Sequence, residues 1–382
     1  MDVPITPDVL AWAMREGGYD AKELARAVDV SPAVLESWLA GTSRPGVTKL
    51  RKLSSVLRRP TATFLLPRPP QSKLPALDFR HPPGREGRAL SHTERVRLRE
   101  AVRLQRALSW VSGELKAAEV KLPKYSSRQD PEAAGIAIRE QLGVDAETQT
   151  GWKSEYVAFR EWRARVEAMN VVVLALPLGA DSARGFSVWD ERAPLIAVNT
   201  HWNAYARVFT LFHELGHLLS RTSSVCEEDF SRKHKEATDP IERWCEAFAA
   251  SVLLPWGDAA EYLERHHHWD GRSPIRDLKT ASALARKFKI SVRATVLTLI
   301  GHDVAPWSLY RAIPKASEKK AEGGGGSGRS RAEARRDEYG GRTVSIIRRG
   351  LERDVLGPDD AIGYLSIGDS ELQAFLSPAL GR

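Results

Sequence analysis

The 382-residue sequence contains only two cysteines, Cys226 and Cys245, and no Cys-x-x-Cys pair. Two thiols are too few for a disulfide framework in a chain of this size, and they fit a reducing compartment. No apolar run reaches the roughly 18 residues of a membrane span, and the N-terminal MDVPITPDVL lacks the basic-then-apolar order of a secretory signal. We therefore expect a cytoplasmic protein without a membrane partner.

The excess of one charge sign is also small. Lys and Arg outnumber Asp and Glu by 57 to 49, which gives a net charge of +8. Such an excess permits a nucleic-acid or acidic partner, but spread over this length it serves solubility equally well. The length itself predicts two or three domains, because single cores seldom grow much beyond about 250 residues.

The first sixty residues carry the start and stop signals of short helices. Asp20 and Glu23 form a capping box, and Ser31 with Pro32 supplies the N-cap and first position of a second helix that runs to Leu39. A later helix is expected from about Val47 to Leu57. Because the turn between the first two helices is short, the pair predicts a helix-turn-helix.

The second helix of this pair is the candidate for contact with DNA. It and the turn after it offer five side chains to a groove: Ser31, Ala33, Val34, Ser37 and Arg44. The helix also carries Glu36 and has no Arg, Lys, Gln or Asn to read base edges. DNA binding through residues 20–60 and a scaffolding or dimerising role therefore both stay open.

The rest of the chain changes its pattern several times. β-branched runs near residues 172, 186 and 196 predict a small sheet, and LARKFKIS near residue 287 repeats the spacing of LARAVDVS near residue 27. A glycine-rich basic stretch near residue 325 is typical of a flexible linker. We expect these segments: a helix-turn-helix domain over 1–67, a connector with a long helix over 68–120, a domain with the sheet over 121–270, a helix-turn-helix-like segment over 271–314, a flexible basic linker over 315–340 and a small helical module over 341–382.

TLFHELGHLL, residues 210–219, places His213 and His217 four positions apart, with Glu214 directly after the first. On a helix both imidazoles leave one face and can hold one ion, and zinc binds neutral imidazole nitrogen readily. Glu214 is rotated off that line, so its carboxylate can act as a base on a water molecule. The alternative is an ordinary buried helix whose histidines hydrogen-bond to backbone groups, because such a helix could have the same sequence.

A catalytic zinc site needs a third protein ligand. The next helical stretch, DPIERWCEAFAASVLLP, places Glu242 and Glu246 on one face of an otherwise apolar helix. Two acids on such a face are costly to bury unless a cation neutralises them. We assign Glu242 to the metal and expect Glu246 to accept the outer N–H of a liganding histidine. The alternative is that Glu242 interacts only with its own helix dipole.

RVFTLFHELGHLL, followed by IERWCEAFAASVLLP and preceded by RGFSVWDERAPLIAVNT, resembles the ImmA/IrrE metallopeptidases of bacteria and phages, in the branch with an N-terminal Xre-type helix-turn-helix. The resemblance implies a five-helix Xre-like domain, a zincin-like catalytic domain, and one Zn2+ held by His213, His217 and Glu242. It also implies a role in cutting or otherwise relieving a repressor. Glu246 stands where the family commonly has asparagine.

We therefore expect a mostly helical α+β protein with a small sheet and further helix-turn-helix-like bundles on its C-terminal side. Its expected function is a zinc-dependent endopeptidase whose substrate is a protein, a helix-turn-helix repressor. The alternative is a DNA-binding transcriptional regulator, or an antitoxin-like partner of a toxin, with a structural or ligand-sensing zinc site. Glu214 favours the enzyme, because a structural site needs no base beside its ligands.

Overall fold

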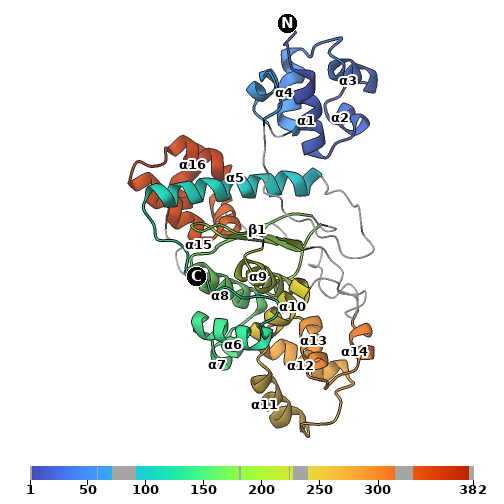
Figure 1. The fold of residues 1–382 in the computed structure, drawn as a ribbon, viewed down its shortest axis with the longest axis vertical. Helices are drawn as coiled ribbons and strands as arrows, with labels where there is room; N and C mark the ends of the chain where they lie inside the picture. Colours follow the sequence, from blue (N-terminus) through green and yellow to red (C-terminus); the bar gives the residue numbers. More distant parts are fainter. Residues whose placement is uncertain are drawn as a thin grey trace. The chain divides into compact units, whose positions relative to one another are not determined.

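The computed structural model describes residues 2–57, 59–70, 92–179, 182–222, 224–226, 240–314 and 330–377. The chain folds into two compact units, one from the described parts of Met1–Ala76 and Gly87–Glu100, the other from those of Leu77–Glu86 and Ala101–Arg382 (Figure 1). Helices dominate both units, and a small sheet lies in the second, so the predicted α+β class is confirmed. No helix in the described residues combines the length and hydropathy needed to cross a membrane.

The N-terminal unit is a five-helix bundle in which the fifth helix is a 3-10 helix. The predicted caps form: Asp20 accepts a hydrogen bond from the Glu23 N–H at 2.7 Å, and Glu23 accepts one from the Asp20 N–H at 3.0 Å. Leu24, Leu35 and Trp38 lie in its core. Its helices are α1 (Pro7–Gly17), α2 (Ala21–Ala27), α3 (Pro32–Leu39), α4 (Val47–Leu57) and η1 (Thr61–Leu65).

Helix α5 (His92–Glu114) contributes residues to both units, since the division falls after Glu100. Within the N-terminal unit, Arg95 donates to the carbonyl oxygen of Arg15 at 3.2 Å and Arg99 to that of Glu16 at 3.0 Å. These carbonyls belong to the last turn of α1, whose acceptors have no partner within the regular helix. Two arginines of α5 thus cap the end of α1, and these bonds join the first half of α5 to the N-terminal bundle.

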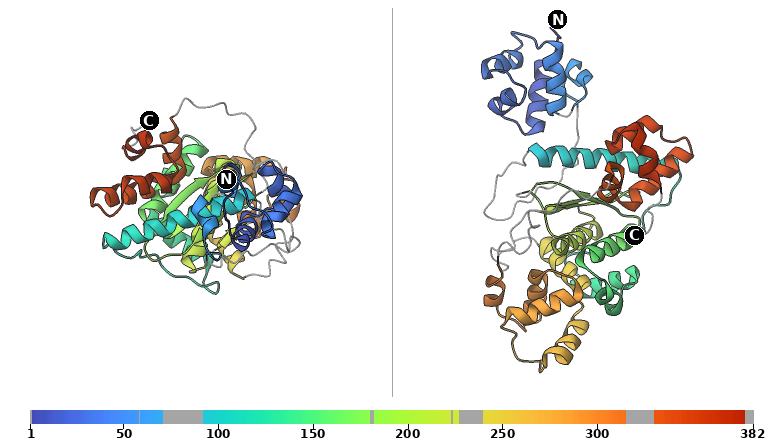
Figure 2. Two further views of the ribbon diagram at one scale, coloured as in Figure 1. Left: turned by 90° about the horizontal axis from the view of Figure 1, so that it is seen from above. Right: turned by 180° about the vertical axis from the view of Figure 1, so that it is seen from behind.

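The sheet of the second unit has the strand order β1-β3-β2-β4. β1 runs parallel to β3, whereas β2 runs antiparallel to both of its neighbours. Every residue of the three predicted strands is buried, and Figures 1 and 2 show α5 and α9 on opposite sides of the sheet. The strands are β1 (Val172–Leu176), β2 (Gly185–Val188), β3 (Leu195–Asn199) and β4 (Ser224–Cys226), and the last of these is additional to the prediction.

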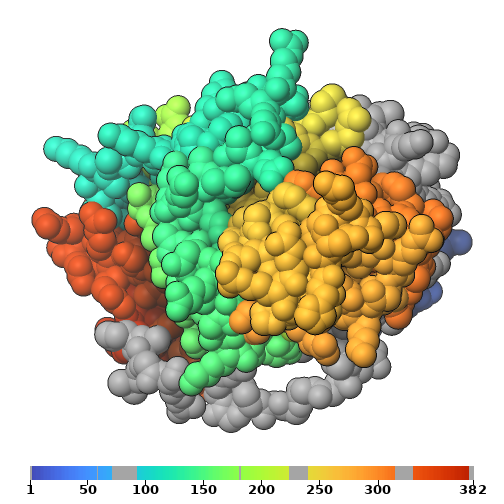
Figure 3. All heavy atoms as spheres, turned by 90° about the horizontal axis from the view of Figure 1, so that it is seen from below, coloured from blue at the N-terminus to red at the C-terminus, as the bar shows by residue number. Residues whose placement is uncertain are grey.

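One continuous core joins the sheet to the helices around it. Leu284, Phe288 and Leu299 belong to the same buried cluster as Phe212 and Phe248, and the space-filling view shows the helices after residue 255 against those before residue 170 (Figure 3). The helices of the predicted segment over 271–314 therefore share one core with the helices that precede them. The helices are α6 (Pro131–Leu142), α7 (Ala146–Gly151), α8 (Glu155–Ala168), α9 (Ala204–Leu219), α10 (Pro240–Leu253), α11 (Trp256–His267), α12 (Leu278–Phe288), α13 (Val292–Gly301) and α14 (Trp307–Arg311).

The C-terminal helices also depart from the prediction. Residues 315–329 of the expected linker lie outside the described residues, but the expected linker residues from Arg331 to Gly340 are helical. Ser330 and Glu333 form a capping box at this start, and burial of Ala332 and Tyr339 holds the helix on the protein. The helices are α15 (Arg331–Glu352), α16 (Pro358–Leu365), η3 (Asp369–Glu371) and α17 (Leu372–Leu376).

Helix α15 packs against β1 and α8, so the predicted module over 341–382 is part of the second unit. The helix is kinked at Gly340, whose φ of 81° places it in the left-handed region. Arg163 donates to the carbonyl oxygen of Asp337 at 2.5 Å before the kink, and Glu167 accepts from the Gly341 N–H at 3.1 Å after it. An ion pair of α8 thus satisfies the helix ends that the kink creates.

Candidate metal centre

Helix α9 carries the two histidines through the centre of the second unit. Asn203 caps its start by accepting from the Ala206 N–H at 3.0 Å, and all of its residues except Tyr205 and Arg207 are buried. An apolar helix is covered on all sides here because the sheet lies on one side and α8 and α10 on the others. His213, Glu214 and His217 are therefore held among packed side chains.

Two glycines let the neighbouring helix α10 come close. A Cβ added at Gly216 of α9 would lie 3.0 Å from the Sγ and 3.3 Å from the Cα of Cys245. A Cβ at Gly135 of α6 would lie 2.8 Å from the Cβ of Ser251. Because neither glycine has a side chain, α10 packs tightly between α9 and α6, which brings Glu242 to the histidine pair.

The three predicted ligands converge on one point. The Nε2 atoms of His213 and His217 are 3.2 Å apart, and the Glu242 carboxylate lies 3.2 Å from the first and 3.3 Å from the second. His213 and His217 are buried, and Glu242 is partly exposed. One ligand atom from each residue can be chosen so that all lie within 4.8 Å of one another.

These separations fit a tetrahedral ion. Two atoms that each lie about 2.05 Å from one zinc ion at the tetrahedral angle are about 3.3 Å apart. The distance between the two nitrogens, 3.2 Å, is close to that value, and Glu242 approaches them with different oxygens, Oε2 at 3.2 Å from His213 and Oε1 at 3.3 Å from His217. The two nitrogens and the carboxylate could therefore bind a single ion without a large movement of the helices.

The charges around this point also favour a cation. Burial alone would raise the pKa of Glu242, but hydrogen bonds and charges from both histidines hold it well below its usual range. Burial would lower the pKa of His213, but Glu242, helped by Glu214 and Glu246, raises it to about 9. The three carboxylates thus favour a positive charge at the position between the imidazoles, which a bound cation would supply.

The outer nitrogens of the two imidazoles have different surroundings. His217 Nδ1 lies 3.1 Å from Oγ1 of Thr222. His213 Nδ1 is buried, and no hydrogen-bond partner for it is found in the described part of the chain. The hydrogen bond predicted from a liganding histidine to Glu246 is thus absent there, because Thr222 takes the outer nitrogen of His217. Burial raises the pKa of Glu246 to about 7.

Glu214 is fully buried on α9, close to the first residue of β2. A Cβ added at Gly185 would lie 2.6 Å from Thr210 Cγ2 and 3.5 Å from Glu214 Cγ. Only a glycine allows the strand to lie so near the helix at this position. The carboxylate is thus held between α9 and the sheet, on the same helix as both histidines and one residue from the first.

A buried polar network that the sequence did not suggest supports the end of α10. Arg139 donates to the carbonyl oxygen of Val252 at 2.7 Å, and Gln149 donates to those of Leu253 at 2.9 Å and Phe288 at 2.6 Å. Arg139 also donates to the Gln149 side chain at 2.6 Å. Burial lowers the pKa of Arg139 to about 10. These bonds satisfy the last carbonyls of α10 and link that helix to α6, α7 and α12.

The predicted DNA contacts lie on and after α3, and some of their polar groups bond within the bundle. Ser31 Oγ accepts from the Val34 N–H at 3.4 Å, and Ser37 Oγ donates to the Val34 carbonyl oxygen at 2.7 Å. Ala33, Val34 and Arg44 are exposed, and Val34 is 40% exposed. Of the five, only Arg44 brings a charge to the surface, so contact with DNA stays a prediction.

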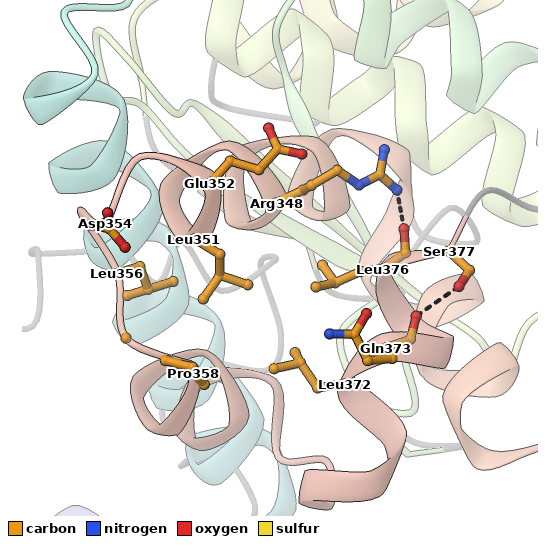
Figure 4. A pocket seen from close by; sticks show the side chains of 11 residues that line it. Arg348, Leu351, Glu352, Asp354, Leu356, Pro358, Leu372, Gln373, Leu376 and Ser377 are labelled. Atoms are coloured by element: carbon orange, nitrogen blue, oxygen red, sulfur yellow. Dashed lines mark hydrogen bonds between the residues drawn. The ribbon is translucent and has the colours of Figure 1, made fainter.

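A pocket of about 600 Å³ lies within the second unit, between the end of α15, the start of α16 and α17 (Figure 4). Its walls include Leu351, Leu356, Leu372 and Leu376, and Arg348 closes one side by donating to the Leu376 carbonyl oxygen. None of its lining residues belongs to the metal group. It is therefore not the site that the histidines form.

Two segments of the chain match known protein families. Residues 166–299 match the IrrE N-terminal-like domain of the peptidase M78 family, and residues 10–64 match a helix-turn-helix domain. No curated protein sequence matches the chain. The first match includes His213, Glu214, His217 and Glu242, and the second includes α2 and α3. Together they are the arrangement of the ImmA/IrrE family with a helix-turn-helix domain, which confirms the sequence resemblance and supports a metallopeptidase joined to a regulator domain.

Proposed function

We propose that this protein is a zinc-dependent endopeptidase that acts in transcriptional regulation by cutting a specific repressor. The observation that carries the proposal is the convergence of His213, His217 and Glu242 beside the fully buried Glu214. This group lies in the segment that matches a metallopeptidase family.

The donor set favours zinc over the harder divalent cations. Calcium and magnesium prefer oxygen ligands, whereas zinc readily binds two imidazole nitrogens and one carboxylate oxygen. Among the described residues the group has three protein ligands. Structural zinc sites commonly use four, whereas catalytic sites keep one position open for water or substrate. Three protein ligands therefore support a catalytic site.

In the proposed reaction, His213, His217 and Glu242 hold the ion, and Glu214 handles the proton. A bound zinc ion would supply Lewis-acid polarisation of the amide carbonyl that is cut. Glu214 takes a proton from the attacking water and passes it to the leaving amine, a transfer that contributes about 10²- to 10⁴-fold in rate. Its burial next to the histidine pair keeps this carboxylate away from bulk water.

The proposed substrate is a protein met in a specific complex, and a helix-turn-helix repressor is the candidate. The catalytic segment shares its chain with a second compact unit that carries a helix-turn-helix. Such a unit recognises a macromolecule, DNA or protein, by its surface. We therefore expect little cleavage of casein or of unrelated peptides, and one or a few cuts in the repressor.

The test compares Glu214→Gln with the parent and with Glu140→Gln, which changes an exposed glutamate of α6. Each protein is loaded with zinc, assayed for metal, and incubated with a panel of purified repressors whose fragments are identified by mass spectrometry. We expect Glu214→Gln to keep its zinc and lose at least about 100-fold in cleavage rate, while Glu140→Gln cuts like the parent.

Two results would contradict the proposal. Equal cleavage by Glu214→Gln and the parent would place the base elsewhere. A zinc-loaded parent that cuts no repressor, yet binds DNA or a partner protein only with zinc present, would favour the alternative of a regulator with a structural or sensing site.

A further inference from the structure

We infer that Thr222 is a positioning residue that fixes the tautomer and ring orientation of His217, so that its Nε2 meets the ion without a proton. The inference rests on the proposed function, because it deepens the metal site on which that function depends. Thr222 lies three residues beyond the end of α9 and has no place in the family motifs noted above.

Thr222 contacts His217 through two of its groups. Its backbone N–H donates to the His217 carbonyl oxygen at 2.9 Å, which fixes the start of the loop on the helix end. Its Oγ1 lies 3.1 Å from His217 Nδ1 and 3.2 Å from the His217 carbonyl oxygen. The hydroxyl is thus held between the imidazole and the backbone of the same residue.

The count of protons favours one tautomer. The Thr222 hydroxyl has a single proton, and two acceptors other than the imidazole lie near it: the His217 carbonyl oxygen at 3.2 Å and Ser220 Oγ at 2.9 Å. When that proton goes to either acceptor, the lone pairs of Thr222 Oγ1 face His217 Nδ1. Nδ1 can then carry the ring proton and donate it, so that Nε2, on the side of Glu242 and His213, can give up its own proton when an ion binds.

The two histidines are unequal in this respect. No partner for His213 Nδ1 occurs in the described part of the chain, so its tautomer has no comparable support there. A metal ligand must be deprotonated at the binding nitrogen, and a hydrogen bond on the other nitrogen both orients the ring and raises its basicity. The Thr222 hydroxyl therefore supports the tautomer and ring orientation of His217 that a bound ion requires.

The loop does not depend on the Thr222 hydroxyl for its position. Arg221, in the left-handed region with φ of 59°, donates to the carbonyl oxygens of Leu122 at 2.7 Å and Leu218 at 2.9 Å. Its guanidinium also lies 3.8 Å from the centre of the Trp189 ring. Because these bonds and the Thr222 N–H remain, Thr222→Val should fold like the parent.

The experiment measures the zinc affinity of the full chain by competition with a chromophoric chelator. Thr222→Val removes the hydroxyl and keeps the shape, whereas Thr222→Ser keeps the hydroxyl. Thr298→Val is the control, because Thr298 is a buried threonine far along the chain in α13, and its hydroxyl donates to the Ala294 carbonyl oxygen at 3.1 Å. The melting temperature of each metal-free variant is recorded beside its zinc affinity.

We expect Thr222→Val to lose about 10- to 100-fold in zinc affinity, the range usual for partners of metal-bound histidines. Thr222→Ser should stay within about threefold of the parent, because it restores the acceptor. Thr298→Val should bind zinc like the parent. In ¹⁵N-histidine spectra of the zinc-loaded protein, the Nδ1 proton of His217 should exchange with water faster in Thr222→Val than in the parent.

Three results would overturn the inference. If the parent binds zinc tightly and Thr222→Val binds it equally tightly, the role of Thr222 is refuted and the proposed metal site stands. If Thr222→Ser binds zinc as weakly as Thr222→Val, the effect is one of packing and not of the hydroxyl. A parent that binds no zinc removes the proposed function and this inference together.

Discussion

The close approach of α9 and α10 at Gly216 predicts that one methyl group there will weaken metal binding. In Gly216→Ala, the new Cβ would lie 3.0 Å from Cys245 Sγ, 3.2 Å from its Cβ and 3.3 Å from its Cα. Unstrained carbon contacts begin at about 3.5 Å. Rotation of the Cys245 side chain cannot move its Cα, so the two helices must separate by a few tenths of an ångström.

That separation matters because Glu242 lies on the same helix as Cys245, three residues earlier. Metal–ligand distances are usually held within about 0.2 Å of their ideal values, so a shift of this size strains the bond to Glu242. We expect zinc affinity to fall about 10-fold, the lower end of the loss seen when a liganding group is mispositioned. Overpacking should cost about 1–3 kcal/mol of folding free energy, offset by about 1 kcal/mol because alanine favours a helix over glycine.

The assay is zinc competition together with urea denaturation of the metal-free protein. Gly363→Ala is the control, because Gly363 lies in α16 and its added Cβ would meet no atom within 4 Å. The control should keep its zinc affinity and gain up to about 1 kcal/mol in stability. If Gly216→Ala binds zinc as tightly as the parent, the spacing of α9 and α10 does not position Glu242, and the reasoning is refuted.

Two further predictions concern the support of the site. Gly340→Ala should destabilise the protein by at least about 1–2 kcal/mol, because a left-handed φ of 81° is unfavourable for alanine and its Cβ would overlap Glu167 and Arg163. The control is Gly257→Ala, where the added Cβ meets no atom within 4 Å. Equal melting temperatures of the two variants would contradict the account of the kink. Gln149→Leu should lower the free energy of unfolding, measured by urea denaturation, by about 2–4 kcal/mol, because it leaves the carbonyl groups of Leu253 and Phe288 buried without their donor. An unchanged urea midpoint would show that this network does not hold α10.

Local signals carried most of what the sequence could predict. The helix from Ser31 to Leu39 and the helix from Val47 to Leu57 were predicted with their bounds, because their caps and apolar spacing lie within a few residues. The spacing of His213 and His217 is equally local. Glu242 could be selected because an acid on an apolar helix needs a partner, although nothing in its own segment indicates where that partner lies.

The missed features depend on contacts between distant parts of the chain. Thr222 was not singled out because its role depends on how the chain turns after α9, and Gly216 because its partner Cys245 lies on another helix. Residues 331–340 resemble a linker in composition, since they are rich in charge and end in glycine. They form a helix because Ala332 and Tyr339 are buried against the rest of the unit, which the composition does not reveal.

The most direct test of the central claim is to locate the ion. Crystals of the full chain grown with zinc, with diffraction recorded on both sides of the zinc absorption edge, give the position of each bound zinc ion. We predict one strong anomalous peak per chain, about 2 Å from Nε2 of His213, Nε2 of His217 and a carboxylate oxygen of Glu242. A chain that binds zinc in solution but shows its peak elsewhere, or with one of these three residues turned away, would contradict the account.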